Sequence, residues 1–126
     1  MVVKSNLLSY IAQAIYDKKG FNILALDIRK NAFLYDYVII AEGSADVHVK
    51  ALAKFVLEQM KKKKQKPILV EGMEHGEWVI LDYGDIAVHL FLKEIREKYC
   101  LEEIWNKGKI VNLKINTKKS KRIKKK

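Results

Sequence analysis

Residues 71–105 read EGMEHGEWVILDYGDIAVHLFLKEIREKYCLEEIW, and this stretch decides the fold. It contains two short apolar runs, 77–82 and 85–91, whose length and composition are typical of β-strands. Only Tyr83 and Gly84 separate the aspartate that ends the first run from the aspartate that opens the second. Because glycine adopts positive φ at little cost, this spacing predicts a tight β-hairpin.

Side chains alternate between the two faces of a strand, so the hairpin should have one apolar face and one mixed face. The apolar face, which is expected to meet the core, carries Val79, Leu81, Ile86, Val88 and Leu90. The mixed face carries Trp78, Ile80, Asp82, Asp85, Ala87 and His89. An aromatic side chain beside fixed polar groups is typical of a protein interface. The alternative is a core Trp78 whose N–H is hydrogen-bonded internally.

Helices flank the hairpin on both sides in the sequence. After it, a helix is expected from about residue 93 to Trp105, with a break near Cys100. Before it, Pro67 ends a helix predicted at 45–64 and opens a strand at 67–71. The apolar side chains of the 45–64 helix recur at helical spacing, at Val49, Leu52, Ala53, Val56 and Met60.

The N-terminal part predicts a helix and two further strands. Residues 5–18 form an amphipathic pattern that Ser5 can cap and Gly20 ends. The strands expected at 22–28 and 36–41 are close enough to pair antiparallel, and the first, with almost no polar alternation, is expected to be buried on both faces. The helix after the second run leads to a returning strand through a right-handed crossover with parallel strands. The predicted fold is therefore α/β, a five-stranded mixed sheet with helices packed on it.

The length of 126 residues predicts one domain with a single core. We expect this domain at 1–113 and a basic disordered tail at 114–126; residues 106–113 form either a short extension of the fold or the start of the tail. No apolar run approaches the roughly 18 residues that span a bilayer. The single cysteine excludes an intrachain disulfide and agrees with a reducing compartment. A cytoplasmic protein without membrane contact is expected.

The net charge of +10 is unevenly distributed. Eight of the 25 basic residues lie in 114–126, which contains no acidic residue. The rest of the chain has 17 basic and 15 acidic residues, so its net charge is only +2. The tail is a polycation that either keeps the protein soluble or binds a nucleic-acid backbone. The expected RNA contacts are Lys118, Lys119, Lys121 and Arg122. A second basic run, 61–64 with Lys66 beyond it, is explained by the favourable interaction of cations with a helix end.

One arrangement of carboxylates requires a test for catalysis. The carboxylates of Asp82 and Asp85 could bind magnesium, and the backbone N–H groups of the helix that starts after Gly43-Ser44 could bind phosphate. The spacing does not match such a site, because the aspartates flank a turn and lie a helix and a strand beyond Ser44. Accepting backbone hydrogen bonds in the turn is the simpler role for them.

The remaining candidate reactive groups show no pattern. His48, His75 and His89 lack the spacing of zinc ligands, and a surface position is expected for His48. His89 is expected to face a partner or to be hydrogen-bonded, and Cys100 to pack. No nucleophile motif or phosphate-binding loop is present. We therefore expect no enzyme, no metal and no cofactor.

Residues 36–60 and 71–105 together resemble the ribosomal silencing factor family, also called the Iojap-related proteins. The motifs that carry the resemblance are EG followed by WVILDYGD (78–85), VHLF (88–91) and LEEIW (101–105). The resemblance covers roughly residues 5–105. It implies a fold similar to that of nucleotidyltransferases, without their active site.

The resemblance also implies a function. In the family, a similar sheet surface docks on protein fourteen of the large ribosomal subunit, sterically blocks joining of the small subunit and so represses translation. Carried over to this sequence, the partner contacts are Trp78, Asp82, Tyr83, Asp85 and His89, together with Glu71. Two alternatives remain open: a nucleotidyltransferase-like enzyme using Gly43-Ser44 with Asp82 and Asp85, and an RNA-binding module driven by the tail. The sequence does not decide whether the chain forms a homodimer.

Overall fold

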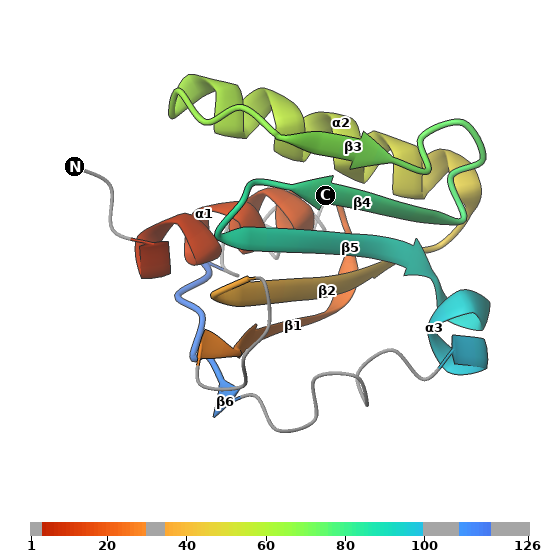
Figure 1. Ribbon diagram of the computed structural model, residues 1–126. Coiled ribbons are helices and arrows are strands. Elements are labelled where there is room, and N and C mark those ends of the chain that lie inside the picture. The colour runs from red at the N-terminus through yellow and green to blue at the C-terminus, as the bar shows by residue number, and fades with distance from the viewer. Residues whose placement is uncertain (1–3, 30–34, 100–108, 117–126) are drawn as a thin grey trace.

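A computed structural model describes residues 4–29, 35–99 and 109–116 of the protein (Figure 1). Within these residues the elements are α1 (Lys4–Asp17), β1 (Phe21–Asp27), β2 (Tyr37–Gly43), α2 (Asp46–Lys62), β3 (Leu69–Glu71), β4 (Trp78–Asp82), β5 (Ile86–Leu92), α3 (Lys93–Tyr99) and β6 (Lys109–Ile110). Every element that the sequence predicts in the described residues is present. The predicted continuation of α3 to Trp105, and its break near Cys100, lie outside the described residues.

The strands form one mixed sheet in the order β3-β4-β5-β2-β1-β6. Neighbouring strands are antiparallel except for the central pair, β2 and β5, which are parallel. This arrangement confirms the α/β class and the antiparallel pairing of β1 with β2. The connection through α2 leads from β2 to β3, which runs in the same direction, as predicted, but with β5 and β4 between them.

The sheet has six strands in the described residues rather than the predicted five, because β6 pairs with the outer edge of β1. Leu26 lies opposite Ile110, and the N–H of Val111 donates to the carbonyl oxygen of Ala25 at 2.9 Å. A strand of two residues is too short to show a period in its sequence. Periodicity could therefore not resolve the role of residues 106–113.

Residues 109–116, which we call the C-terminal strap, continue from β6 onto α1. The N–H of Lys114 donates to Ser9 Oγ at 3.1 Å, and the N–H of Asn116 donates to Gln13 Oε1 at 2.6 Å. Residues 114–116, the start of the predicted tail, therefore lie against α1. The rest of the predicted tail, 117–126, lies outside the described residues.

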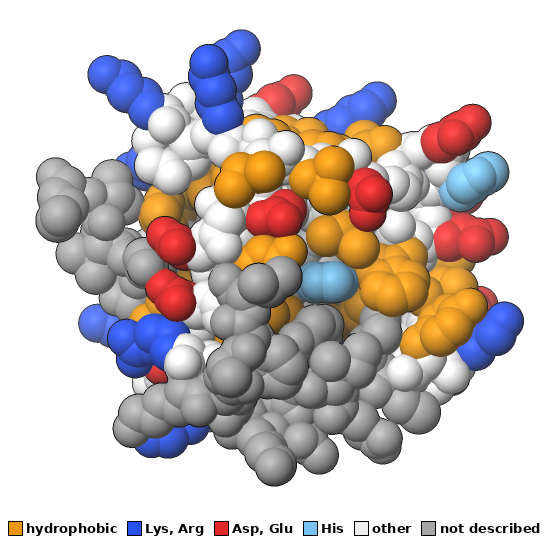
Figure 2. Space-filling model, viewed as in Figure 1, with side chains coloured by type: hydrophobic (Ala, Val, Ile, Leu, Met, Phe, Trp, Pro, Cys, Tyr) orange, Lys and Arg blue, Asp and Glu red, His pale blue; other side chains and the backbone are white. Residues whose placement is uncertain are grey.

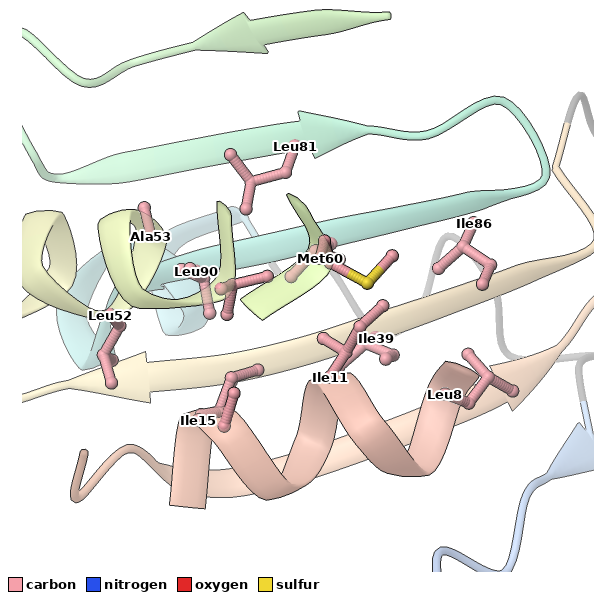
Figure 3. Packing of buried hydrophobic residues seen from close by; sticks show 14 of the residues in the cluster. Leu8, Ile11, Ile15, Ile39, Leu52, Ala53, Met60, Leu81, Ile86 and Leu90 are labelled. Atoms are coloured by element: carbon pink, nitrogen blue, oxygen red, sulfur yellow. The ribbon is translucent and has the colours of Figure 1, made fainter. Parts of the chain in front are cut away.

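Helices α1 and α2 cover one face of the sheet and bury the main core against it (Figure 3). Figure 3 shows Ile11 of α1 and Met60 of α2 converging on Ile39 of β2. The predicted apolar stripe of α2 is buried there, and so is the predicted apolar face of the hairpin. The assignment of the two hairpin faces from their alternation is therefore confirmed.

The opposite face of the sheet carries a second, smaller buried cluster, which consists of Leu26, Ile28, Val38, Ile40, Ala87 and Phe91. Strands β2 and β5 are consequently buried on both faces. Strand β1 is also expected from its sequence to be buried on both faces, but this holds only in part, because Phe21 and Asn22 at its start are exposed. The pairing register shifts there, and Asn22 takes a φ of 52°, so the start of β1 diverges from a regular strand.

Candidate functional site

On the sheet face opposite α1 and α2, the side chains of β3 and β4 are accessible. The pairing register places Leu69 beside Asp82 and Glu71 beside Ile80, and Trp78 lies on the same face of β4. We call these five residues the sheet-edge surface. Leu69 and Glu71 are exposed, and the three β4 side chains are partly exposed. Figure 2, viewed from this side, shows hydrophobic and acidic side chains intermingled.

Trp78 has the largest side chain of the sheet-edge surface. Its indole N–H donates to Nδ1 of His89 at 3.1 Å. Its ring centroid lies 6.3 Å from that of Phe91 and 5.7 Å from that of Tyr99. The N–H is thus satisfied internally, as expected for a core tryptophan, while the ring stays partly accessible. These contacts hold the ring in one orientation.

His89 lies behind Trp78, with only 8% of its surface exposed. Since Nδ1 accepts the indole N–H, the imidazole is neutral with its proton on Nε2. Burial lowers the pKa of His89 to about 4, although the charge of Asp82 acts in the opposite direction. The expectation of a hydrogen-bonded His89 is therefore confirmed. Direct contact with a partner does not fit its burial, and it contacts the accessible face through the hydrogen bond from Trp78.

The turn between β4 and β5 is the short one that the sequence predicts. Gly84 has a φ of 89°, and the N–H of Tyr83 donates to the carbonyl oxygen of Ile86 at 2.9 Å. The carboxylate of Asp82 accepts hydrogen bonds of 2.8 Å from the Gly84 N–H and from the Tyr35 hydroxyl. The turn-forming role of Asp82 is confirmed, and the two donors orient its carboxylate.

Tyr83 and Asp85 lie on either side of Gly84 but have different surroundings. Asp85 is exposed, and its carbonyl oxygen accepts the Tyr37 N–H at 3.1 Å, which joins the turn to β2. The Tyr83 ring packs against the main core, and its buried hydroxyl has no hydrogen-bond partner among the described residues. Burial raises the pKa of Tyr83 to about 12. Tyr83 therefore faces the helix side, and the structure does not bring it together with Trp78.

Several apolar residues at this site were not predicted as partner contacts. Ile68 is 73% exposed, Leu69 47% and Tyr99 51%, and Ile80 is partly exposed between Trp78 and Asp82. Alternation along β4 is enough to place Ile80 on the same face as Trp78 and Asp82. The position of Leu69 depends on the register of a three-residue strand, which the sequence does not specify.

A buried ion pair holds α3 against the sheet, and α3 carries Tyr99. Arg96 Nη1 lies 3.0 Å from Glu42 Oε2 and donates to the carbonyl oxygen of Asn22 at 2.8 Å. Asn22 Nδ2 donates to the other Glu42 oxygen at 3.2 Å. Because the charged partners are 54 residues apart in the chain, no local pattern could have paired them.

The catalytic site of the enzyme alternative is not assembled. Gly43, just before the proposed phosphate site, lies opposite Leu92, whereas Asp82 lies opposite Ala87 near the other end of β5. Five residues of strand separate these two levels, a distance of about 17 Å. Side chains so far apart cannot hold one nucleotide phosphate and its metal ion between them.

The start of α2 is also occupied by internal contacts. His48 Nδ1 lies 2.9 Å from the backbone nitrogen of Ser44 and 3.1 Å from its hydroxyl oxygen, and His48 Nε2 lies 2.8 Å from the carbonyl oxygen of Lys18. His48 is partly exposed, in agreement with the expected surface position, and it also links α2 to the end of α1. Among the described residues, no group of three or more side chains could hold a metal ion.

Comparison with known proteins agrees with this geometry. Residues 3–126 match the family model described as ribosomal silencing factor during starvation. The chain belongs to the ribosomal silencing factor family. It is 33% identical to the ribosomal silencing factor of Bacillus subtilis over 110 residues, which cover 87% of this chain and 93% of that protein. The resemblance read from the motifs is confirmed.

Two further members extend the comparison. The silencing factor of Chromobacterium violaceum is 39% identical over 93 residues, which cover 74% of this chain and 76% of that protein. A crystal structure of a protein from the same organism matches with a TM-score of 0.80 and 33% identity, covering 92% of this chain and 95% of the other. The silencing-factor fold therefore applies to nearly the whole chain. In the part of the molecule that the structure describes, no helix is both long and apolar enough to cross a membrane.

Proposed function

We propose that this silencing factor docks through its sheet-edge surface on protein fourteen of the large ribosomal subunit. By occupying that position it sterically blocks joining of the small subunit and represses translation in the cytoplasm. The mechanism requires no reaction and no cofactor. It rests on membership of the silencing factor family and on the geometry of the sheet-edge surface.

The observation that carries the proposal is the fixed indole of Trp78 on an accessible, acidic sheet face. Leu69 and Ile80 add apolar area next to it, and Glu71 and Asp82 supply carboxylates from the same two strands. An aromatic anchor with polar groups at its rim is the usual composition of an interface hot spot. Ribosomal proteins are basic, so these carboxylates can accept charge-assisted hydrogen bonds from lysine or arginine.

Steric blocking depends on a rigid body more than on particular side chains. The sheet-edge surface is backed by β5, whose residues Ile86–Phe91 are buried, and by the main core beneath α2. A factor anchored through this surface therefore presents packed secondary structure, and not a mobile loop, to an approaching subunit. Displacing it would require breaking the docked interface.

Co-sedimentation with separated ribosomal subunits tests the proposal. The protein should pellet with large subunits and not with small ones, and titration calorimetry should detect binding to isolated protein fourteen. Light scattering should then show slower association of the two subunits. Co-sedimentation with small subunits alone, or with neither subunit, would contradict the proposal.

The tail-driven RNA-binding module is the second candidate, and the concentration of positive charge beyond residue 113 favours it. The two candidates differ in what the tail selects. If the tail drives recognition, a chain ending at Asn116 should lose its preference for large subunits. If the sheet-edge surface drives recognition, the preference should remain.

A further inference from the structure

A cluster of lysines lies at the end of α2 and is not used by the proposed docking. Lys61, Lys62, Lys63, Lys64 and Lys66 are all exposed. None of them forms an ion pair with a residue that the structure describes. Two are in the last turn of α2, where the helix dipole favours cations, but that interaction does not account for five lysines among six consecutive residues.

Helix α1 connects this cluster to the C-terminal strap. The Tyr10 hydroxyl donates to the carbonyl oxygen of Gln59 at 3.1 Å, and Lys63 Nζ lies 4.7 Å from the centre of the Tyr10 ring. The adjacent residue, Ser9, accepts the N–H of Lys114. Ser9 and Tyr10 are consecutive residues of α1, so Lys114 and Lys63 contact the same turn of this helix.

These lysines and the carboxylates proposed for docking belong to different segments of the chain. We call Lys61, Lys62, Lys63, Lys64, Lys66 and Lys114 the basic helix-end surface. Glu71, Asp82 and Asp85 belong to β3 and to the hairpin turn. Figure 2 shows Lys and Arg side chains projecting at the upper left, where α2 ends in Figure 1, and acidic side chains across the sheet face.

We propose that the basic helix-end surface binds the phosphate backbone of RNA. Lysine binds phosphate as a point charge, and six lysines within one region match the closely spaced charges of a nucleic-acid strand. The nearest aromatic side chain, Tyr10, has its hydroxyl bonded to Gln59 and its ring beneath Lys63, so it is not available to stack on a base. Binding should therefore be independent of sequence and strongly dependent on salt.

The choice of RNA rests on the proposed function, because docking on the large subunit brings the factor next to ribosomal RNA. The sheet-edge surface would select the protein partner, and the basic helix-end surface would add a second contact to the neighbouring RNA. The strap ends beside α1, where the Asn116 N–H donates to Gln13, and seven basic residues follow Asn116 in the sequence. Recognition and electrostatic attraction would then come from different parts of the molecule.

The test uses the full-length chain and a labelled oligouridylate strand. The variant replaces Lys61, Lys62 and Lys66 with glutamine; Lys63 is kept because it contacts Tyr10, and Lys64 because its φ is 59°. The control replaces the exposed Lys93, Lys98 and Lys109, which lie on α3 and β6, with glutamine and removes the same charge. The slope of log affinity against log salt should become shallower by about 2 in the variant, because each lost phosphate contact contributes about 0.7. The control should keep the wild-type slope.

Three outcomes would overturn the proposal. They are an unchanged slope in the variant, an equal loss in variant and control, and a loss of binding to anionic lipid vesicles that matches the loss for RNA. Trp78→Ala, measured on the same strand and on large subunits, separates this proposal from the docking proposal. It should retain RNA affinity and lose subunit affinity. RNA binding without any subunit binding would leave the basic helix-end surface standing and refute the docking.

Discussion

One hydrogen bond joins the accessible Trp78 indole to the buried His89 on the neighbouring strand. The donor is partly exposed and the acceptor is buried, so each depends on the other. Without His89 the indole would lose its orientation, and without Trp78 the Nδ1 of His89 would lose this donor. Two substitutions can therefore separate binding from folding at this site.

Trp78→Ala should weaken binding to large subunits by about 2 kcal/mol or more, roughly 30-fold in Kd, because it removes the proposed anchor. The ring also contacts Phe91 and Tyr99, so the free energy of unfolding should fall by about 1–2 kcal/mol. Affinity is measured by titration with subunits, and the folded fraction by circular dichroism. Trp78→Phe, which keeps an aromatic ring but lacks the N–H, should lose less affinity. Unchanged affinity per folded Trp78→Ala molecule would make Trp78 a purely structural residue.

His89 should make the stability of the protein depend on pH. Its pKa falls from the ordinary 6.5 to about 4 on folding, so between these values the unfolded chain binds more protons than the folded one. Stability should therefore decrease as pH falls from 6.5 toward 4, by up to about 3 kcal/mol from this group. His89→Gln, whose amide oxygen can still accept the indole N–H, should show a flatter profile. Urea unfolding across this pH range measures the effect.

His75→Gln is the matched control, since it removes a histidine from an exposed position in the turn region before β4. It should retain the wild-type dependence on pH. Parallel profiles for wild type and His89→Gln would show that His89 does not titrate in this range. A lower but parallel profile would show that the substitution only impairs packing.

At the level of elements, the short edge strand β3 and the hairpin turn carry the exposed carboxylates. Asp82 is a poor site for charge reversal, because its carboxylate holds the turn through Gly84 and Tyr35. Glu71 and Asp85 are both exposed. Glu71 is the last residue of β3, and Asp85 directly precedes β5. Substitution at these two positions tests charge with less disturbance of the fold.

Glu71→Lys combined with Asp85→Lys should weaken binding to large subunits by about tenfold or more, because reversed charges repel a basic partner. The association rate should account for much of the loss, and the loss should be greatest at low salt. Stopped-flow association at two salt concentrations measures it. Glu58→Lys, an exposed reversal on α2, is the control for Glu71→Lys and should retain wild-type affinity. Full repression of subunit joining by the double variant would exclude an electrostatic role for these residues.

The main elements follow from local pattern, and their arrangement follows from it only in part. Apolar periodicity located α2 and both hairpin strands, and glycine identified the turn at Gly84. The addition of β6 to β1 and the ion pair between Glu42 and Arg96 join distant parts of the chain, so no local signal reports them. The predicted site shows the same division. Trp78 and Asp82 share a surface as alternation implies, whereas the place of Glu71 beside Ile80 and the burial of His89 and Tyr83 depend on strand register and tertiary packing.

At the scale of the whole molecule, two truncations distinguish the role of the C-terminal strap from that of the basic residues that follow it in the sequence. A chain ending at Asn116 should keep the stability of the full protein and show a weaker salt dependence of large-subunit binding. A chain ending at residue 108 also loses β6 and the packing of Val111 and Leu113 against the main core. Its free energy of unfolding should fall by about 2 kcal/mol or more, measured in urea.

The comparison of these two chains also tests the assignment of the strap. Equal stability of both would show that the strap contributes nothing to the fold. If the chain ending at Asn116 kept the full salt dependence, the residues beyond it would not contact RNA. If that chain bound large and small subunits equally, the tail, and not the sheet, would select the partner.

The strap also sets when the protein can complete its fold during its own synthesis. Ser9 and Gln13 are translated early, but the strap residues that bind them follow 105 and 103 residues later. At about 5–20 residues per second, α1 waits roughly 5–20 seconds for these partners. Over the same interval the outer edge of β1, which β6 later covers, is open to pairing with other chains. Slower elongation lengthens this interval in proportion, so a factor that represses translation would be most exposed to mispairing when translation is already slow.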